Sequence, residues 1–143
     1  MIYLPDTNAF SAYLAGRPKP LVERMTAAFS SGELRLSVMV ASELEFGAEK
    51  ARATLGETKF ARRVADLRKQ LEIEGLGAEF PRFYAMVRTS LEAAGRRIGD
   101  RDTIIAAHAL AIGAVMVTAN VDEFVRVPGL KVENWQLTKP SGE

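Results

Sequence analysis

The sequence predicts an α/β domain with three α/β/α layers, in which helices cover both faces of a mainly parallel sheet. Short apolar runs alternate along the chain with segments of helical periodicity, which is typical of this class. The first run, Met1–Leu4, contains no polar residue, as expected for a strand buried on both faces. The chain has 143 residues, a length that suits one domain. We expect that domain to span residues 1–135 and residues 136–143 to form a C-terminal tail.

In the first half of the chain, strands are expected at residues 1–4, 34–38 and 71–73. A short helix is expected at residues 8–14 and is closed by Gly16. Apolar residues that recur every three or four positions predict three longer helices after it. Their inward faces carry Leu21, Met25, Ala28 and Phe29 in the first, Val40, Leu44, Gly47, Ala48 and Ala51 in the second, and Phe60, Val64, Leu67 and Leu71 in the third.

The second half is expected to hold two helices and two strands. One helix runs from about residue 79 to 94, with Gly95 after it, and the other runs from about residue 102 to 111. Strands follow at residues 114–118 and, more weakly, at 130–132. The inward face of the first helix carries Phe80, Phe83, Val87, Leu91 and Ala94.

Composition limits the chemistry that is available. The chain has no cysteine, which excludes disulfides, thiolate metal sites and a cysteine nucleophile, and its single histidine excludes a multi-histidine zinc site. Any bound metal would therefore have oxygen ligands. The formal net charge of +1 indicates no partner. Because neither a signal-peptide core nor an apolar membrane span is visible, we expect a soluble cytoplasmic protein without membrane contact.

Four polar side chains occupy informative positions. Asp6 and Asn120 each follow a predicted strand, which is where open α/β sheets bind ligands. Asp102 begins a helix, and Glu43 borders the apolar stripe of its helix, where a carboxylate is costly unless a cation satisfies it. Carboxylate clusters of this kind suit Mg²⁺ or Mn²⁺.

Structural roles are open for several of the same residues. Asp6 and Asp102 are both suited to cap a helix N-terminus, and Glu43 could be a solvated helix acid. We expect His108 to be a hydrogen-bonded core histidine rather than a general base. Trp135 is expected to close one end of the core rather than to stack on a nucleic-acid base.

Four segments in order resemble VapC-type toxins of the PIN-domain superfamily. They are Leu4–Asn8, Ala41–Ala48, Ile98–Ala109 and Val117–Phe124, and the sequences Val127–Leu130 and Glu133–Trp135 are similar to the usual ending of the family. The resemblance runs from Met1 to about Trp135. Each motif alone is weak, but all four together at family spacing are specific.

The resemblance implies a PIN-like fold and a Mg²⁺- or Mn²⁺-dependent endoribonuclease toxin that hydrolyses structured RNA, such as tRNA or rRNA, through a metal-bound hydroxide. It assigns the catalytic and metal-binding roles to Asp6, Glu43 and Asp102. It also implies a homodimer and a cognate antitoxin whose tail occupies the catalytic groove. The supporting polar residues are Thr7, Asn8, Thr118 and Asn120, the last of which stands where wider PIN nucleases often have a fourth acid.

Three nearby acids have no assigned role, namely Asp100, Asp122 and Glu123. Asp100 lies two residues before Asp102, but the Ile-Gly-x-x-Asp spacing selects Asp102. Two basic groups are candidates for binding the RNA backbone. Arg96, Arg97 and Arg101 flank the expected site, whereas the segment from Lys50 to Lys69 could equally be a solvated helix face.

Other functions are less well supported. A phosphatase using Asp6 as nucleophile usually has a second acid two residues later, where this chain has Asn8. Nucleotide-cofactor enzymes are disfavoured because neither a GxGxxG turn nor a GxxxxGK[ST] loop is present. The non-enzymatic alternative is an RNA- or protein-binding module with a relic metal site.

Overall fold

Short parallel strands form the centre of the fold in the computed structural model, which describes residues 1–137. Strand β4 (Val115–Val117) pairs with β1 (Tyr3–Pro5) on one side and with β5 (Val132–Glu133) on the other. Strand β2 (Leu36–Ser37) pairs with β3 (Ile73–Glu74), and a parallel bridge from Tyr3 to Leu34 joins this pair to β1. Every observed pairing is parallel, so the prediction of a mainly parallel sheet is confirmed.

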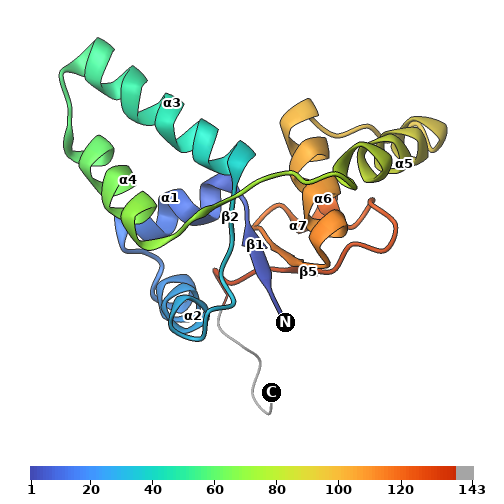
Figure 1. Cartoon of the computed structure of the whole chain (residues 1–143), viewed down its shortest axis with the longest axis horizontal. Helices are drawn as coiled ribbons and strands as arrows, with labels where there is room; N and C mark the ends of the chain where they lie inside the picture. The colour runs from blue at the N-terminus through green and yellow to red at the C-terminus, as the bar shows by residue number, and fades with distance from the viewer. Residues whose placement is uncertain (138–143) are drawn as a thin grey trace.

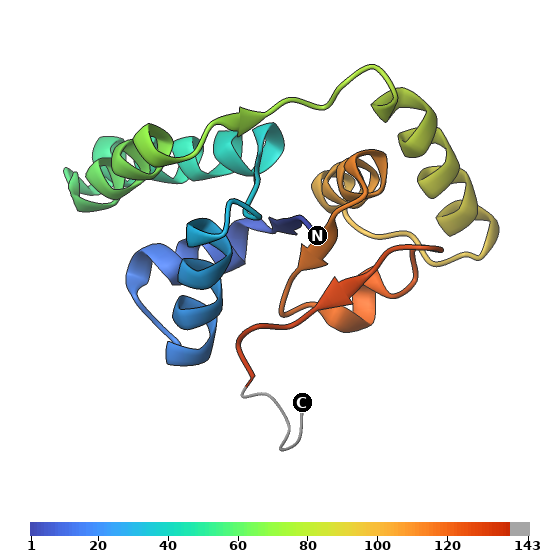
Figure 2. The same cartoon turned by 60° about the horizontal axis from the view of Figure 1, so that its bottom comes forward.

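Helices lie on both sides of these strands, as Figures 1 and 2 show. The first group gathers on one side and comprises α1 (Thr7–Ala15), α2 (Lys19–Ser30), α3 (Val38–Leu55) and α4 (Lys59–Gln70). Helices α5 (Phe80–Ala93) and α6 (Asp100–Ile112) lie on the other side, and the short α7 (Val121–Phe124) follows β4. The predicted three-layer α/β class is therefore confirmed.

The predicted helical stripes form the core. Val40, Leu44 and Ala48 of α3 are buried, as are Val64 and Leu67 of α4 and Val87 and Leu91 of α5. Ala94 was expected to face inward, but this prediction is wrong because α5 ends at Ala93 and Ala94 lies exposed beyond it.

The strands are shorter than predicted, and some are displaced by one or two residues. Residues 34–38 were expected to form one strand, but Ser37 caps α3 by accepting a hydrogen bond from the Met39 N–H at 3.2 Å, so Val38 is already helical. Helix α6 begins at Asp100 rather than Asp102, because Gly99 is its N-cap residue. Asp102 therefore lies in the first turn and does not cap the helix.

His108 and Trp135 have the structural roles that were expected from the sequence. His108 is fully buried, and its Nδ1 and Nε2 lie 2.9 Å from Ser37 Oγ and 3.0 Å from the Gly75 carbonyl oxygen. Trp135 is buried and packs edge-on against Tyr3, with ring centroids 4.9 Å apart. Both predictions are confirmed.

Among residues 1–137, no helix is long and apolar enough to cross a membrane. Most of the expected C-terminal tail, residues 138–143, lies outside the described residues.

Candidate metal centre

Asp6 lies directly after β1, where the carboxyl ends of β1 and β4 are adjacent. Its Oδ1 accepts a hydrogen bond from the Ala9 N–H at 2.8 Å, which caps α1, and its Oδ2 accepts one from Thr118 Oγ1 at 2.6 Å. Burial raises the pKa of the Asp6 carboxyl, the two hydrogen bonds oppose that rise, and the charge of Glu43 adds to it. The capping role and a ligand role are compatible, because each carboxylate oxygen has two lone pairs.

Glu43 projects from the second turn of α3, the helix that follows β2 directly. Its Oε1 accepts a hydrogen bond from Thr7 Oγ1 at 2.8 Å, and its Oε2 pairs with Arg101 Nη1 at 3.2 Å. The side chain is only 20% exposed, so it is not a freely solvated helix acid. Thr7 therefore positions Glu43 as Thr118 positions Asp6.

Asp102 is partly buried in the first turn of α6, and its pKa is raised from 3.8 to about 6. Desolvation is the largest cause, followed by repulsion from Glu123, Asp6 and Glu43, while Arg101 lowers the pKa. The acids named from the sequence are thus near enough to perturb one another. In contrast, the Asp100 side chain is 86% exposed and pairs with Arg97 at 3.4 Å.

Glu123 is a site residue that the sequence analysis left without a role. Of the neighbouring charges, it raises the Asp102 pKa most. The Asn120 amide donates to Glu123, and the Asn120 N–H donates to Thr118 Oγ1 at 3.0 Å. The only signal in the sequence was its position one helical turn after Asn120. Glu123 therefore brings a further carboxylate beside Asn120 and near Asp102.

The remaining predicted residues lie at the margin of this group. Asn8 is exposed, and its side chain makes no hydrogen bond within residues 1–137. Arg97 pairs with Glu92 and Asp100, and Arg96 is exposed. Arg101, which is also expected to contact RNA, pairs with Glu43 in this structure.

The basic segment from Lys50 to Lys69 is partly neutralised. Arg52 pairs with Glu49, and Arg68 pairs with Glu45 at 3.1 Å. These ion pairs support a solvated helix face for part of the segment.

The donor set fits a hard divalent cation. Carboxylate side chains border a hollow of about 410 Å³ that is lined by Glu43, Gly99, Asp100, Arg101 and Asp102. A cation at this place would relieve the repulsion that raises the Asp102 pKa. Within residues 1–137, no three acidic or histidine side chains could hold a metal ion as they stand, so a shared ion requires side-chain rearrangement. Both oxygens of Glu43 accept from other donors, so an ion that binds Glu43 replaces one of these donors or shares an oxygen with it.

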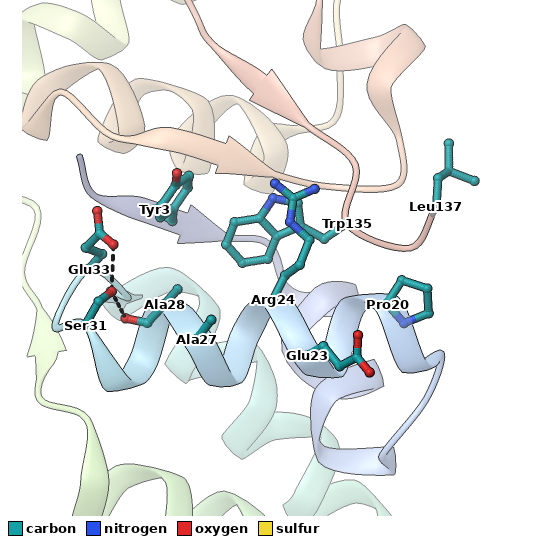
Figure 3. Close-up of a pocket in the computed structure, with 10 residues that line it drawn as sticks. All are labelled: Tyr3, Pro20, Glu23, Arg24, Ala27, Ala28, Ser31, Glu33, Trp135 and Leu137. Carbon is teal, nitrogen blue, oxygen red and sulfur yellow. Dashed lines mark hydrogen bonds between the residues drawn. The ribbon is translucent and has the colours of Figure 1, made fainter. Parts of the chain in front are cut away.

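A second and larger hollow, of about 590 Å³, lies between α2 and the segment around Trp135 (Figure 3). The Arg24 guanidinium lies over the Trp135 ring, 5.0 Å from its centroid, and pairs with Glu133 at 3.1 Å. The Trp135 Nε1–H also donates to Glu133 at 2.9 Å. Since the indole is buried and already stacked, this hollow is not a platform for nucleic-acid bases.

The combination of a parallel sheet with acids at its carboxyl edge is accompanied by a match to a known family. The family model for the PIN domain matches residues 3–130. The chain therefore belongs to the PIN-domain family.

Within that family, the similarity to VapC-type toxins predicted from the four motifs is confirmed. Ribonuclease VapC2 of Rickettsia felis is 32% identical over 135 residues, which cover 94% of this chain and 98% of that protein. Ribonuclease VapC1 of Haemophilus influenzae strain R2866 is 31% identical over 140 residues, with the same coverage of 94% and 98%. The tRNA(fMet)-specific endonuclease VapC of Salmonella typhimurium is 29% identical over 133 residues, covering 93% and 97%.

Solved structures agree with these relatives. The crystal structure of VapBC2 from Rickettsia felis, bound to a DNA fragment from the promoter, contains a chain with a TM-score of 0.84 and 31% identity, covering 94% of this chain and 99% of that one. VapBC-1 from nontypeable Haemophilus influenzae gives a TM-score of 0.80 and 30% identity, covering 96% and 100%.

Proposed function

We propose that this protein is a divalent-metal-dependent endoribonuclease and the toxin of a toxin–antitoxin pair. The observation that carries the proposal is that Asp6, Glu43 and Glu123, which come from three other segments of the chain, all raise the pKa of Asp102. Together with desolvation, which is the largest cause, these charges raise the pKa of Asp102 to about 6. Membership of the PIN-domain family and similarity to proteins named as VapC ribonucleases support the same function.

The protein's own residues hold the carboxylates in place. Ala9 N–H and Thr118 Oγ1 orient Asp6, and Thr7 Oγ1 orients Glu43. Asp6, Glu43 and Asp102 are the proposed ligands of Mg²⁺ or Mn²⁺. When bound, such an ion supplies a Lewis acid that lowers the pKa of a water molecule and offsets charge on the phosphate. Arg96, Arg97 and Arg101 are the proposed contacts to the RNA backbone.

We propose that the substrate is a structured RNA, and tRNA is the first class to test. We also propose that the protein acts on RNA in the cytoplasm. The tRNA(fMet)-specific name of the Salmonella relative supports the choice of tRNA. The VapBC complexes among the similar structures support a cognate antitoxin as partner. We also propose a homodimer, which scattering-detected chromatography tests by a mass of about twice the 15.6 kDa of one chain.

The direct test is incubation of the purified protein with separate tRNA and rRNA preparations in Mg²⁺. We expect internal cleavage that a chelator abolishes and that Mg²⁺ or Mn²⁺ restores, with no cleavage by the Asp6→Asn variant. If the wild-type protein binds RNA with its metal present but leaves it uncut, the binding-module alternative replaces the nuclease.

A further inference from the structure

The contact between Arg101 and Glu43 joins two helices that lie far apart in the sequence. Arg101 Nη1 lies 3.2 Å from Glu43 Oε2, while Thr7 Oγ1 donates to Oε1 of the same carboxylate at 2.8 Å. Both oxygens of Glu43 are therefore bonded within the protein. Any cation that coordinates Glu43 has to replace one of these donors or share an oxygen with it.

Of the two donors, Arg101 is the one that can be displaced more easily. The Arg101 side chain is 66% exposed, whereas the other donor, Thr7, is half-buried. The acceptor, Glu43, is 20% exposed. An ion pair with one mostly exposed partner is weak, because water competes for the charged group that leaves. Arg101 is also next to Asp102, and both line the same hollow, so its charge acts where a divalent cation would lie.

We propose that Arg101 competes with the divalent cation for Glu43 and moves to an RNA phosphate when substrate binds. This inference rests on the proposed function. The exposed guanidinium can bind a phosphate in bidentate geometry, and its departure from Glu43 frees Oε2 for the metal. RNA therefore strengthens metal binding at the site, and by linkage the metal strengthens RNA binding.

The first test is titration of the metal-free protein with Mn²⁺ by calorimetry, without RNA. We expect Arg101→Ala and Arg101→Gln to bind Mn²⁺ about threefold to fivefold more tightly than wild type, because a competing ion pair of this exposure is lost. Arg97→Ala is the matched control, since Arg97 pairs with Glu92 and Asp100 rather than with Glu43. Its Mn²⁺ affinity should change less than about twofold. Unchanged Mn²⁺ affinity in both Arg101 variants, with normal thermal unfolding, overturns the inference.

A double-mutant cycle separates displacement from a general effect of charge. In a Glu43→Gln background there is no carboxylate to compete for, so Arg101→Ala should no longer improve Mn²⁺ binding. If the same improvement persists in that background, Arg101 acts only through its charge and the inference is wrong.

The second part of the inference is tested by RNA binding in the presence of a chelator. Arg101→Ala should weaken the binding of a tRNA probe. It should also reduce the slope of log affinity against log salt concentration by about one, which corresponds to the loss of one phosphate contact. Equal affinity and equal salt dependence in the wild type and the variant overturn the transfer to phosphate. Failure of the wild-type protein to cleave RNA would refute the proposed function but leave the Mn²⁺ titrations interpretable.

Discussion

Two of the hollows among the described residues differ in how the acidic charges near them are compensated. Beside the larger one, Glu133 accepts hydrogen bonds from Arg24 and from the Trp135 indole, which line it. At the smaller one, desolvation and repulsion from Glu123, Asp6 and Glu43 raise the pKa of Asp102 to about 6. The charge of Glu133 is neutralised by its contacts, whereas several like charges add to the effect of burial at Asp102, a pattern that clusters at functional sites. The size of a cavity is therefore a poorer guide to this site than its electrostatics.

The largest loss of RNA cleavage is expected when one carboxylate loses its charge but keeps its shape. Asp6→Asn keeps the side-chain volume and a residue that caps helices well. Because a metal ligand is lost, RNA cleavage should fall by about 100-fold or more, as measured by initial rates on a tRNA substrate.

Asp102→Asn should cause a loss of similar size. Asp100→Asn is the matched control because Asp100 is 86% exposed, and its cleavage rate should stay within about twofold of wild type. If Asp100→Asn is inactive and Asp102→Asn is active, the choice of Asp102 from the motif spacing is wrong.

A smaller loss is expected when a positioning hydroxyl is removed. Thr118→Val deletes the 2.6 Å hydrogen bond to Asp6 and leaves a buried carboxylate oxygen without that donor. Cleavage should fall by about 10-fold, since groups that orient metal ligands typically contribute this much. The acid limb of the pH–rate profile should also move to higher pH, because the lost donor lowers the Asp6 pKa in the wild type.

The control for this change is Thr54→Val, whose hydroxyl donates only to the Lys50 carbonyl on an exposed helix face. Its rate and pH profile should match the wild type. Identical pH profiles for wild type and Thr118→Val would contradict the role given to Thr118.

The raised pKa of Asp102, caused by desolvation and then by repulsion, predicts an effect on stability. The Asp102 pKa is near 3.8 in the unfolded chain and about 6 in the folded one. The folded state therefore binds the Asp102 proton more tightly than the unfolded chain does. The stability that the bound proton contributes is lost as the pH rises from the unfolded pKa through the folded one. Without divalent metal, Asp102→Asn should melt about 2 °C higher than wild type above pH ~7, and the difference should disappear near pH ~4. A lower melting temperature for the variant at neutral pH would show that the repulsion is not destabilising.

The smallest effect on cleavage is expected in the hollow beside α2. Trp135→Phe removes the hydrogen bond to Glu133 and reduces stacking with Arg24, so unfolding should become easier by about 1 kcal/mol. The rate of RNA cleavage should be unchanged at a temperature where the variant is folded. A large loss of cleavage there would mean that the aromatic hollow takes part in the site.

The sequence predicted the layers and most of the helices because each buried stripe repeats at helical spacing. It also indicated Asp6 as a helix cap, which the Ala9 N–H confirms. The ends of elements were less predictable, since Ser37 and Gly99 act as caps that local periodicity does not reveal. Ala94 was misassigned for the same reason.

The part of the site that escaped prediction depends on contacts between distant segments. Glu123 approaches Asp102 only because α7 and the start of α6 lie close together in the folded chain. The pairing of Arg101 with Glu43 spans 58 positions, and no local pattern encodes it. Motif spacing indicated the three carboxylates proposed as ligands, whereas the charges around them could be found only from the tertiary structure.

The most direct measurement is anomalous diffraction from crystals of the protein grown or soaked with Mn²⁺. The account predicts manganese density bounded by the carboxylates of Asp6, Glu43 and Asp102, at oxygen distances of roughly 2.0–2.3 Å. Manganese density elsewhere in the crystal, with the carboxylates of Asp6, Glu43 and Asp102 still in contact only with protein groups, would contradict the account.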